Sequence, residues 1–153
     1  MMRFIHYGHD HFDINQFDKP TNRFGIICKP WGGLWGSPID SPNLSWHDWV
    51  IDNDFETDKY LNGDHFIFNI PNDANILYLR NIEEVLAMEA MDVATIKPFM
   101  GGYEVTSIDF EQLLDFGYDA ILYENSSPQM YYALYGWDVD SVLVLNPKCL
   151  IMD

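Results

Sequence analysis

Residues 29–38 of the chain read KPWGGLWGSP, and this segment limits the possible folds more than any other. Glycine weakens a β-strand and proline cannot donate to its hydrogen-bond ladder, so three glycines and two prolines in ten residues do not suit an ordinary core strand. The mixture suits a ligand cleft, where glycines let a flat ligand approach the backbone, aromatic rings stack on it and Ser37 offers a hydroxyl. The alternative is a bulged edge strand whose two tryptophans fill a core.

Length and composition predict one packed domain that spans residues 1–153. A chain of this size buries about 68–70% of its unfolded surface, which is enough to fold without covalent cross-links. Hydrophobic residues make up 48% of the sequence, which argues against disorder. Cys28 and Cys149 are too few for a disulfide framework and lack the spacing of metal ligands, so we expect buried thiols in a reducing cytosol.

The charge balance is strongly acidic, with 24 acidic residues against 8 basic ones and a net charge of −16. Such a surface repels DNA, RNA and anionic membranes, so we expect no direct binding to nucleic acid or membrane. A basic protein is a more suitable partner, including a nucleic-acid-binding protein whose DNA this surface imitates, and the alternative is that the charge serves solubility alone. The sequence has no signal-peptide pattern and no long apolar run, which predicts a cytoplasmic protein.

Short strands and short helices alternate along the chain without a regular βαβ repeat, which predicts the α+β class. The expected strands cover residues 3–7, 24–28, 34–37, 65–70, 75–79, 120–123 and 141–145. Ser45 and Asp48 indicate a capped helix from residue 46 to about residue 58. Two further helices are expected, one after Asn81 and one that starts at Ser107 or Asp109.

The order of these motifs resembles the ADP-ribosyltransferase family in its small bacterial and phage-encoded forms. The resemblance covers nearly the whole chain and depends on the order and spacing of several motifs together. These are the strand that ends in His6-Tyr7-Gly8, the GGLWGSP run at 32–38, the SWHDW helix at 45–49, a strand pair at 66–79, DFEQLL at 109–114, GYDAI at 117–121 and VLVLNP at 142–147. The resemblance implies a split β-sandwich that holds NAD+ across its cleft.

The resemblance also implies roles for residues of the first two strands. His6 would contact a ribose, and Tyr7 and Gly8 would hold the nicotinamide amide through backbone groups. Trp35 would stack on the nicotinamide ring, and Ser37 stands where the family has a hydroxyl. Trp46 and Trp49 would wall the pocket. Two alternatives stay open: His6 is a structural histidine, and the tryptophans of the helix are ordinary core residues.

The family places a glutamate immediately before the last apolar strand, and this sequence departs from that pattern. Ser141 stands at that position, with Asp138 and Asp140 just upstream. The alternation of a strand would put both aspartates on one face, and Asp140, with Asp138 as the alternative, is the candidate to stabilise the oxocarbenium-like transition state. The second glutamate of arginine-modifying members is absent, so arginine is not supported as the acceptor. The spacing of His9 and His11 is a weak metal signal, and no metal is expected.

The function expected from the resemblance is mono-ADP-ribosyl transfer from NAD+ to a macromolecular acceptor, expected to be a protein. The small architecture resembles that of a phage or mobile-element effector acting in a bacterial cytoplasm, such as an anti-defence protein. The first alternative is a catalytically inactive acidic protein that blocks the nucleic-acid site of a basic partner. The second alternative is NAD+ hydrolysis without an acceptor.

Overall fold

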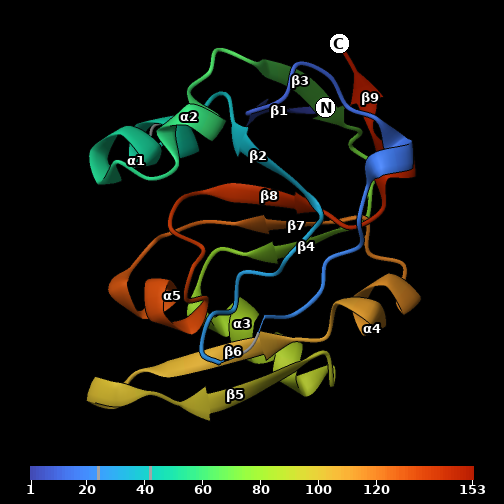
Figure 1. The fold of residues 1–153 in the computed structure, drawn as a ribbon. Helices are drawn as coiled ribbons and strands as arrows, with labels where there is room; N and C mark the ends of the chain where they lie inside the picture. The colour runs from blue at the N-terminus through green and yellow to red at the C-terminus, as the bar shows by residue number, and fades with distance from the viewer. Residues whose placement is uncertain (24, 42) are drawn as a thin grey trace.

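The computed structural model describes residues 1–23, 25–41 and 43–153, with Met100 described by its backbone alone. Its strands form a mixed seven-stranded sheet in the order β4-β7-β8-β2-β1-β3-β9 and a separate β5-β6 hairpin (Figure 1), which confirms the α+β class. The strands are β1 (Met2–Tyr7), β2 (Leu34–Pro38), β3 (His65–Ile70), β4 (Ile76–Leu79), β5 (Ala94–Pro98), β6 (Glu104–Ile108), β7 (Ala120–Tyr123), β8 (Ser141–Val144) and β9 (Ile151–Met152).

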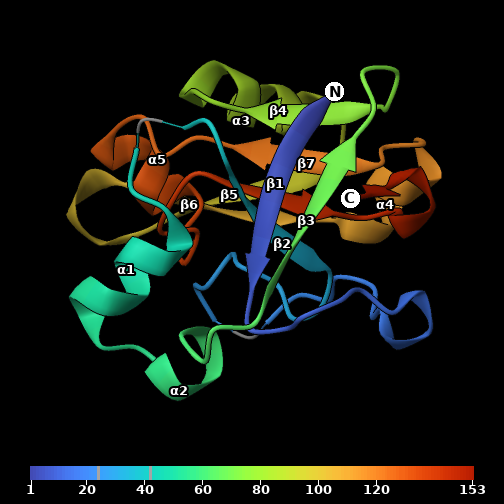
Figure 2. The ribbon, with the colours of Figure 1, turned by 90° about the horizontal axis from the view of Figure 1, so that it is seen from above.

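Five short α-helices and three 3-10 turns connect the described strands. The helices are α1 (Trp46–Asn53), α2 (Thr57–Tyr60), α3 (Ile82–Ala90), α4 (Phe110–Asp115) and α5 (Pro128–Ala133), and the 3-10 turns are η1 (Ile14–Gln16), η2 (Met100–Gly102) and η3 (Pro147–Cys149). Figure 2 shows α1 and α2 projecting to one side of β1 and β3. None of the helices in the described ranges has the length and apolar character that crossing a bilayer requires.

The large sheet is folded over on itself. β3 and β4 are consecutive in the chain but stand five positions apart in the sheet order. At about 4.8 Å per strand a flat sheet would separate them by roughly 24 Å, whereas six residue steps reach only about 20 Å when fully extended. The sequence predicted these segments as a strand pair, and that prediction is wrong: β4 pairs with β7 in parallel, and β3 pairs with β1 and β9.

Two hydrophobic cores explain why the sheet folds in this way. One core lies between the two halves of the sheet, where Phe4 of β1 and Phe68 of β3 pack with Val142 and Val144 of β8. The other lies on the opposite face of β4, β7 and β8, which α3, α4, α5 and the β5-β6 hairpin cover. Both halves of the sheet therefore bury one face in the first core, and β4, β7 and β8 bury their other face in the second core.

Strand β2 joins the two halves and carries the second half of the glycine-rich segment. Its first residues pair with β8, with Trp35 opposite Leu143, and its last residues pair with β1, with Ser37 opposite Ile5. Figure 1 shows β2 running from beside β8 up to the upper strands. A Cβ on Gly36 would lie 2.6 Å from the ring of Phe68, so only glycine fits at the crossing.

Local signals placed most of the predicted elements, although several differ in extent from the prediction. Helix α1 has the predicted capping box of Ser45 and Asp48, but it ends at Asn53, and the chain reaches α2 only after Asp54 in the left-handed conformation. Of the strand expected over residues 24–28, Phe24 lies outside the described residues, and residues 25–28 form a turn and irregular chain. The strand expected over residues 141–145 ends one residue earlier.

Candidate functional site

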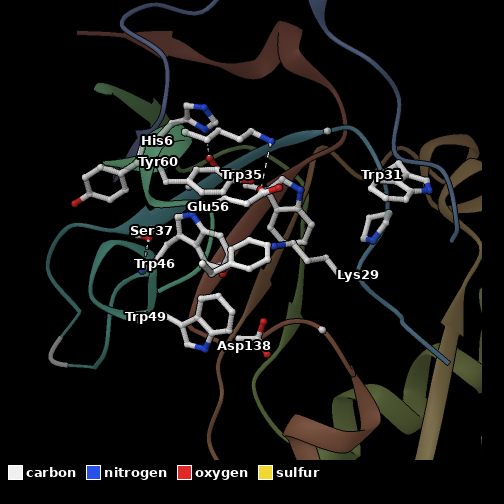
Figure 3. Close-up of a pocket in the computed structure, with 18 of the residues that line it drawn as sticks. His6, Lys29, Trp31, Trp35, Ser37, Trp46, Trp49, Glu56, Tyr60 and Asp138 are labelled. Atoms are coloured by element: carbon white, nitrogen blue, oxygen red, sulfur yellow. Dashed lines mark hydrogen bonds and ion pairs between the residues drawn. The ribbon is translucent and has the colours of Figure 1, made fainter. Parts of the chain in front are cut away.

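A cavity of about 660 Å³ opens between β1, β2, helices α1 and α2, and two loops. One loop precedes β2 and contains Arg23 and Lys29, and the other follows α5 and contains Tyr135 and Asp138, with Tyr131 of α5 beside it. The volume falls within the usual range for sites that bind small molecules. We call this cavity the aromatic pocket, because tryptophan and tyrosine rings form much of its wall (Figure 3).

Most residues predicted for the site lie together in the aromatic pocket. Its lining includes His6, Tyr7, Trp35, Ser37, Trp46, Trp49 and Asp138. Gly8 and Asp140 are not part of the lining. Gly8 has a positive φ of 107° and donates its backbone N–H to the carbonyl of Asp64 at 2.9 Å. That N–H is therefore already used and is not available to hold an amide.

His6 is held by both ring nitrogens. Its Nδ1 lies 2.8 Å from the carbonyl oxygen of Trp35, which can only accept, so Nδ1 carries the proton and donates. Its Nε2 lies 2.8 Å from Nδ1 of His9 and accepts from it. Burial lowers the pKa of His6 to about 4, which keeps the imidazole neutral. A ligand that needs Nε2 must therefore replace His9, which lies exposed beside it.

Trp35 and Ser37 lie on the same side of β2 and support different parts of the wall. The ring of Trp35 meets that of Trp137 edge-on at 4.8 Å, and its indole N–H donates to the carbonyl of Gly32 at 3.2 Å. The hydroxyl oxygen of Ser37 accepts the backbone N–H of Trp46 at 3.2 Å. Ser37 thus fixes the start of α1 against β2, a structural task in addition to any contact with a ligand.

The tryptophans of α1 both pack and line the pocket. Trp46 and Trp49 stack with ring centroids 5.0 Å apart and planes 9° apart, and Phe55 and Tyr60 meet them edge-on. Both tryptophans are half-buried and face the aromatic pocket. The two interpretations left open by the sequence, core packing and pocket wall, therefore both apply. The tryptophans pack against neighbouring rings and also line the pocket.

Basic residues gather in the pocket although the chain as a whole is acidic. Of the 8 lysines and arginines, Arg23, Lys29 and Lys59 line it, and they face only two carboxylates among the described lining, Asp138 and Glu56. The Nε of Arg23 is buried and has no hydrogen-bond partner among the described residues. Lys59 lies 3.9 Å from Glu56. The pocket is thus suited to a ligand that carries anionic groups.

Lys29, Lys59 and Glu56 were missed by sequence reasoning. Lys59 and Glu56 reach the pocket through α2, a helix that had no separate sequence signal. Lys29 had one available signal, since it is a basic residue directly before the proline, tryptophan and glycines of an aromatic segment in an acidic chain. Burial lowers its pKa to about 8, against the opposing effect of Asp138.

The two candidate aspartates occupy different environments. Asp140 is 6% exposed, and its carboxylate accepts the backbone N–H of Asn125 at 2.8 Å and the side-chain amide of Asn43 at 2.7 Å. Asp138 is half-buried in the pocket, and burial raises its pKa while Lys29 acts in the opposite direction. The expectation that both share one face is wrong, because residues 137–140 form an irregular bend before β8 and strand alternation does not apply there.

Ser141 also lines the pocket, at the first position of β8. The position at which the family resemblance places a glutamate therefore faces the cavity, but it holds a serine whose hydroxyl donates to the carbonyl of Val139 at 2.7 Å. Asp138 is the carboxylate near this position that reaches the pocket. Within the described residues, no group of three or more histidine, cysteine, aspartate or glutamate side chains is arranged to hold a metal ion.

These groups together can bind a ligand with a flat ring and anionic groups. Indole faces stack on planar rings and attract cationic ones, lysine and arginine bind phosphates, and a carboxylate stabilises positive charge that develops on a nearby atom. The evidence for function comes from this geometry, since no protein-family model, no curated protein and no solved structure matches the chain.

Proposed function

We propose that the protein is an ADP-ribosyltransferase-like enzyme that transfers ADP-ribose from NAD+ to a protein acceptor. The observation that carries the proposal is the convergence of His6, Trp35 and Asp138, from three separate segments, on one pocket with a basic rim. The folded-over sheet, with β2 joining its halves, is compatible with a split β-sandwich. A cofactor other than NAD+ and a metal ion are not part of the proposal.

Each wall of the aromatic pocket has a role in this reaction. The nicotinamide ring, a flat cation in NAD+, stacks on the indole faces of Trp35 and Trp46. Lys59 and Arg23 bind the pyrophosphate. Asp138 faces the nicotinamide ribose and stabilises positive charge on the sugar as the glycosidic bond breaks.

The reaction balances without a further reactant. The bond between the ribose C1′ and the nicotinamide nitrogen breaks, and its electron pair leaves with neutral nicotinamide. The acceptor nucleophile forms a new bond to C1′ and gives its proton to solvent or to a nearby base. When water is the acceptor, the same steps give NAD+ hydrolysis.

The test is direct binding and turnover with NAD+. We expect saturable binding by calorimetry, release of nicotinamide, and transfer of label from NAD+ to protein in a bacterial lysate. Asp138→Asn should lose turnover, and Asp115→Asn, which removes an exposed carboxylate on α4, is the matched control. A folded wild-type protein that neither binds NAD+ nor releases nicotinamide would contradict the proposal.

A second candidate is a binding protein without turnover. It is favoured by the serine at position 141, where the resemblance places a glutamate, and by the net charge of −16. Such a protein would occupy the nucleic-acid site of a basic partner. Salt-sensitive binding to a basic protein, together with undetectable nicotinamide release, would favour this candidate whether or not the protein binds NAD+.

A further inference from the structure

The side chain of Lys29 enters the aromatic pocket and ends between the tryptophans (Figure 3). Its Nζ lies 4.3 Å from the ring centroid of Trp46 and 4.9 Å from that of Trp35. The ammonium makes no hydrogen bond and no ion pair within 4.0 Å to any residue in the described ranges. Contacts with two indole faces thus offset the loss of hydration of the Lys29 ammonium.

Hydrogen bonds fix the backbone of Lys29, whereas no polar partner among the described residues holds the end of its side chain. The backbone N–H of Lys29 and that of Cys28 both donate to the carbonyl of Tyr135, at 3.3 Å and 2.8 Å. The stem beyond this anchor has four rotatable bonds and no polar partner that holds its end. Displacement of the ammonium from the space between the rings therefore breaks no hydrogen bond or ion pair with the described residues.

We propose that the space between Trp35 and Trp46 is a cation site that Lys29 occupies in the unliganded protein, and that a ligand with a flat cationic ring must displace the Lys29 ammonium to bind there. This deepens the proposed function, on which it rests to the extent that nicotinamide in NAD+ is the ring. Two positive charges cannot share the same indole faces, so Lys29 acts as a tethered competitor. It sets the affinity of the site and favours rings able to replace it.

The competition depends on pH. Burial lowers the pKa of Lys29 to about 8, so its competing charge is present below that pH and is lost above it. Binding of a permanently charged ring should therefore strengthen as pH rises from 6.5 to 9. The other titratable or charged groups that line the pocket are His6, Tyr7, His9, Arg23, Glu56, Lys59, Tyr60, Tyr131, Tyr135 and Asp138. Lys29→Met keeps all of them and most of the side-chain volume, so any pH dependence left in that variant belongs to those groups.

The probe is 1-methylnicotinamide, a flat cation that has no phosphate groups. We would measure its dissociation constant by tryptophan fluorescence at pH 6.5 and pH 9 for the wild type, Lys29→Met and Lys29→Arg. At pH 6.5 Lys29→Met should bind about tenfold tighter than the wild type, since a desolvated cation–π contact no longer has to be broken. At pH 9 the gap should shrink, and Lys29→Arg should bind weakly at both values because arginine keeps its charge.

Equal affinity of the wild type and Lys29→Met at pH 6.5 would overturn the inference, as would the same pH dependence in both proteins. Thermal melting checks that Lys29→Met is folded, and if it is not, the pH profiles of the wild type and Lys29→Arg decide. NAD+ binding, measured in parallel, separates the two proposals. Tighter binding of the probe by Lys29→Met without NAD+ binding by any variant would remove the proposed enzyme and keep the cation site, and NAD+ turnover without a Lys29 effect would do the reverse.

Discussion

The Nε2 atom of His6 lies 2.8 Å from the Nδ1 atom of His9, and the two rings stack with centroids 5.1 Å apart. The contact joins a residue in strand β1 to an exposed residue of the following loop. It keeps His6 in one tautomer and one orientation while the carbonyl of Trp35 holds the other nitrogen. A ribose hydroxyl that replaced His9 would meet a neutral acceptor already aimed at the pocket.

Replacement of His6 should change how stability depends on pH. The folded-state pKa of about 4 lies below the ordinary value of 6.5, so protonation favours the unfolded chain. The stabilising effect of the neutral ring is complete above pH 6.5 and is lost as the pH falls from 6.5 through 4. Between pH 7 and pH 4.5, the free energy of unfolding measured with urea should fall more for the wild type than for His6→Gln. Equal decreases in the two proteins would contradict a lowered pKa of His6.

Replacement of His6 should also weaken NAD+ binding. His6→Ala is expected to cost about 0.5–1.5 kcal/mol of binding free energy, the usual net value of one hydrogen bond. Calorimetry on the folded variant measures this loss. His9→Ala is the comparison, because it frees Nε2 of His6 and should bind NAD+ at least as tightly as the wild type. Weaker binding by His9→Ala than by His6→Ala would move the ribose contact to His9.

NAD+ binding should depend on the aromatic face of Trp35 more than on the volume of its side chain. Trp35→Ala should weaken NAD+ binding by about tenfold, because the stacking face on the nicotinamide ring is lost. Trp35→Phe keeps an aromatic face against Trp137 and should retain more of the affinity. NAD+ should also quench the tryptophan fluorescence of the wild type. Unchanged affinity in a folded Trp35→Ala protein would remove this residue from the site.

The two aspartates should separate into a catalytic and a structural residue. Asp138→Asn should lower nicotinamide release by roughly 10²–10³ while NAD+ binding changes little, because its charge acts on the transition state. Asp140→Asn should instead lower the free energy of unfolding by about 1–3 kcal/mol, since the buried carboxylate accepts hydrogen bonds from Ser41, Asn43 and Asn125. Full turnover in Asp138→Asn would show that another group does the chemistry.

Gly36 should be essential for stability at the crossing of β2. Gly36→Ala places a methyl group 2.6 Å from the ring of Phe68 and should cost about 1–3 kcal/mol of unfolding free energy. Phe68→Leu makes room there, so the double variant should lose less than the two single losses added together. Chemical denaturation of the four proteins measures the difference, and strict additivity would mean that the overlap relaxes by another route.

The helix starts were predictable because a cap depends on residues only three positions apart. Ser45 and Asp48 form the predicted capping box, and Asn81 and Asp109 accept the backbone N–H groups of Glu84 and Gln112 at 3.0 Å. Most strand positions followed in the same way from apolar runs. The elements between residues 94 and 108 and strand β9 lacked comparably clear local patterns and were not predicted. Helix α5 was missed although Ser127 caps it and Pro128 stands at its first position.

Local sequence thus determined the identity of most elements and the gathering of aromatic residues, glycines and Ser37 in one segment. The tertiary structure decided which strands are neighbours, since the pairing of β4 with β7 depends on burying two cores at once and not on the turn after β3. It also decided that Asp138 faces the pocket while Asp140 is buried, because the irregular bend before β8 removes the alternation of a strand. Lys29 reached the space between Trp35 and Trp46 for the same reason: a side chain's neighbours across a cavity come from distant parts of the chain, and no local period encodes them.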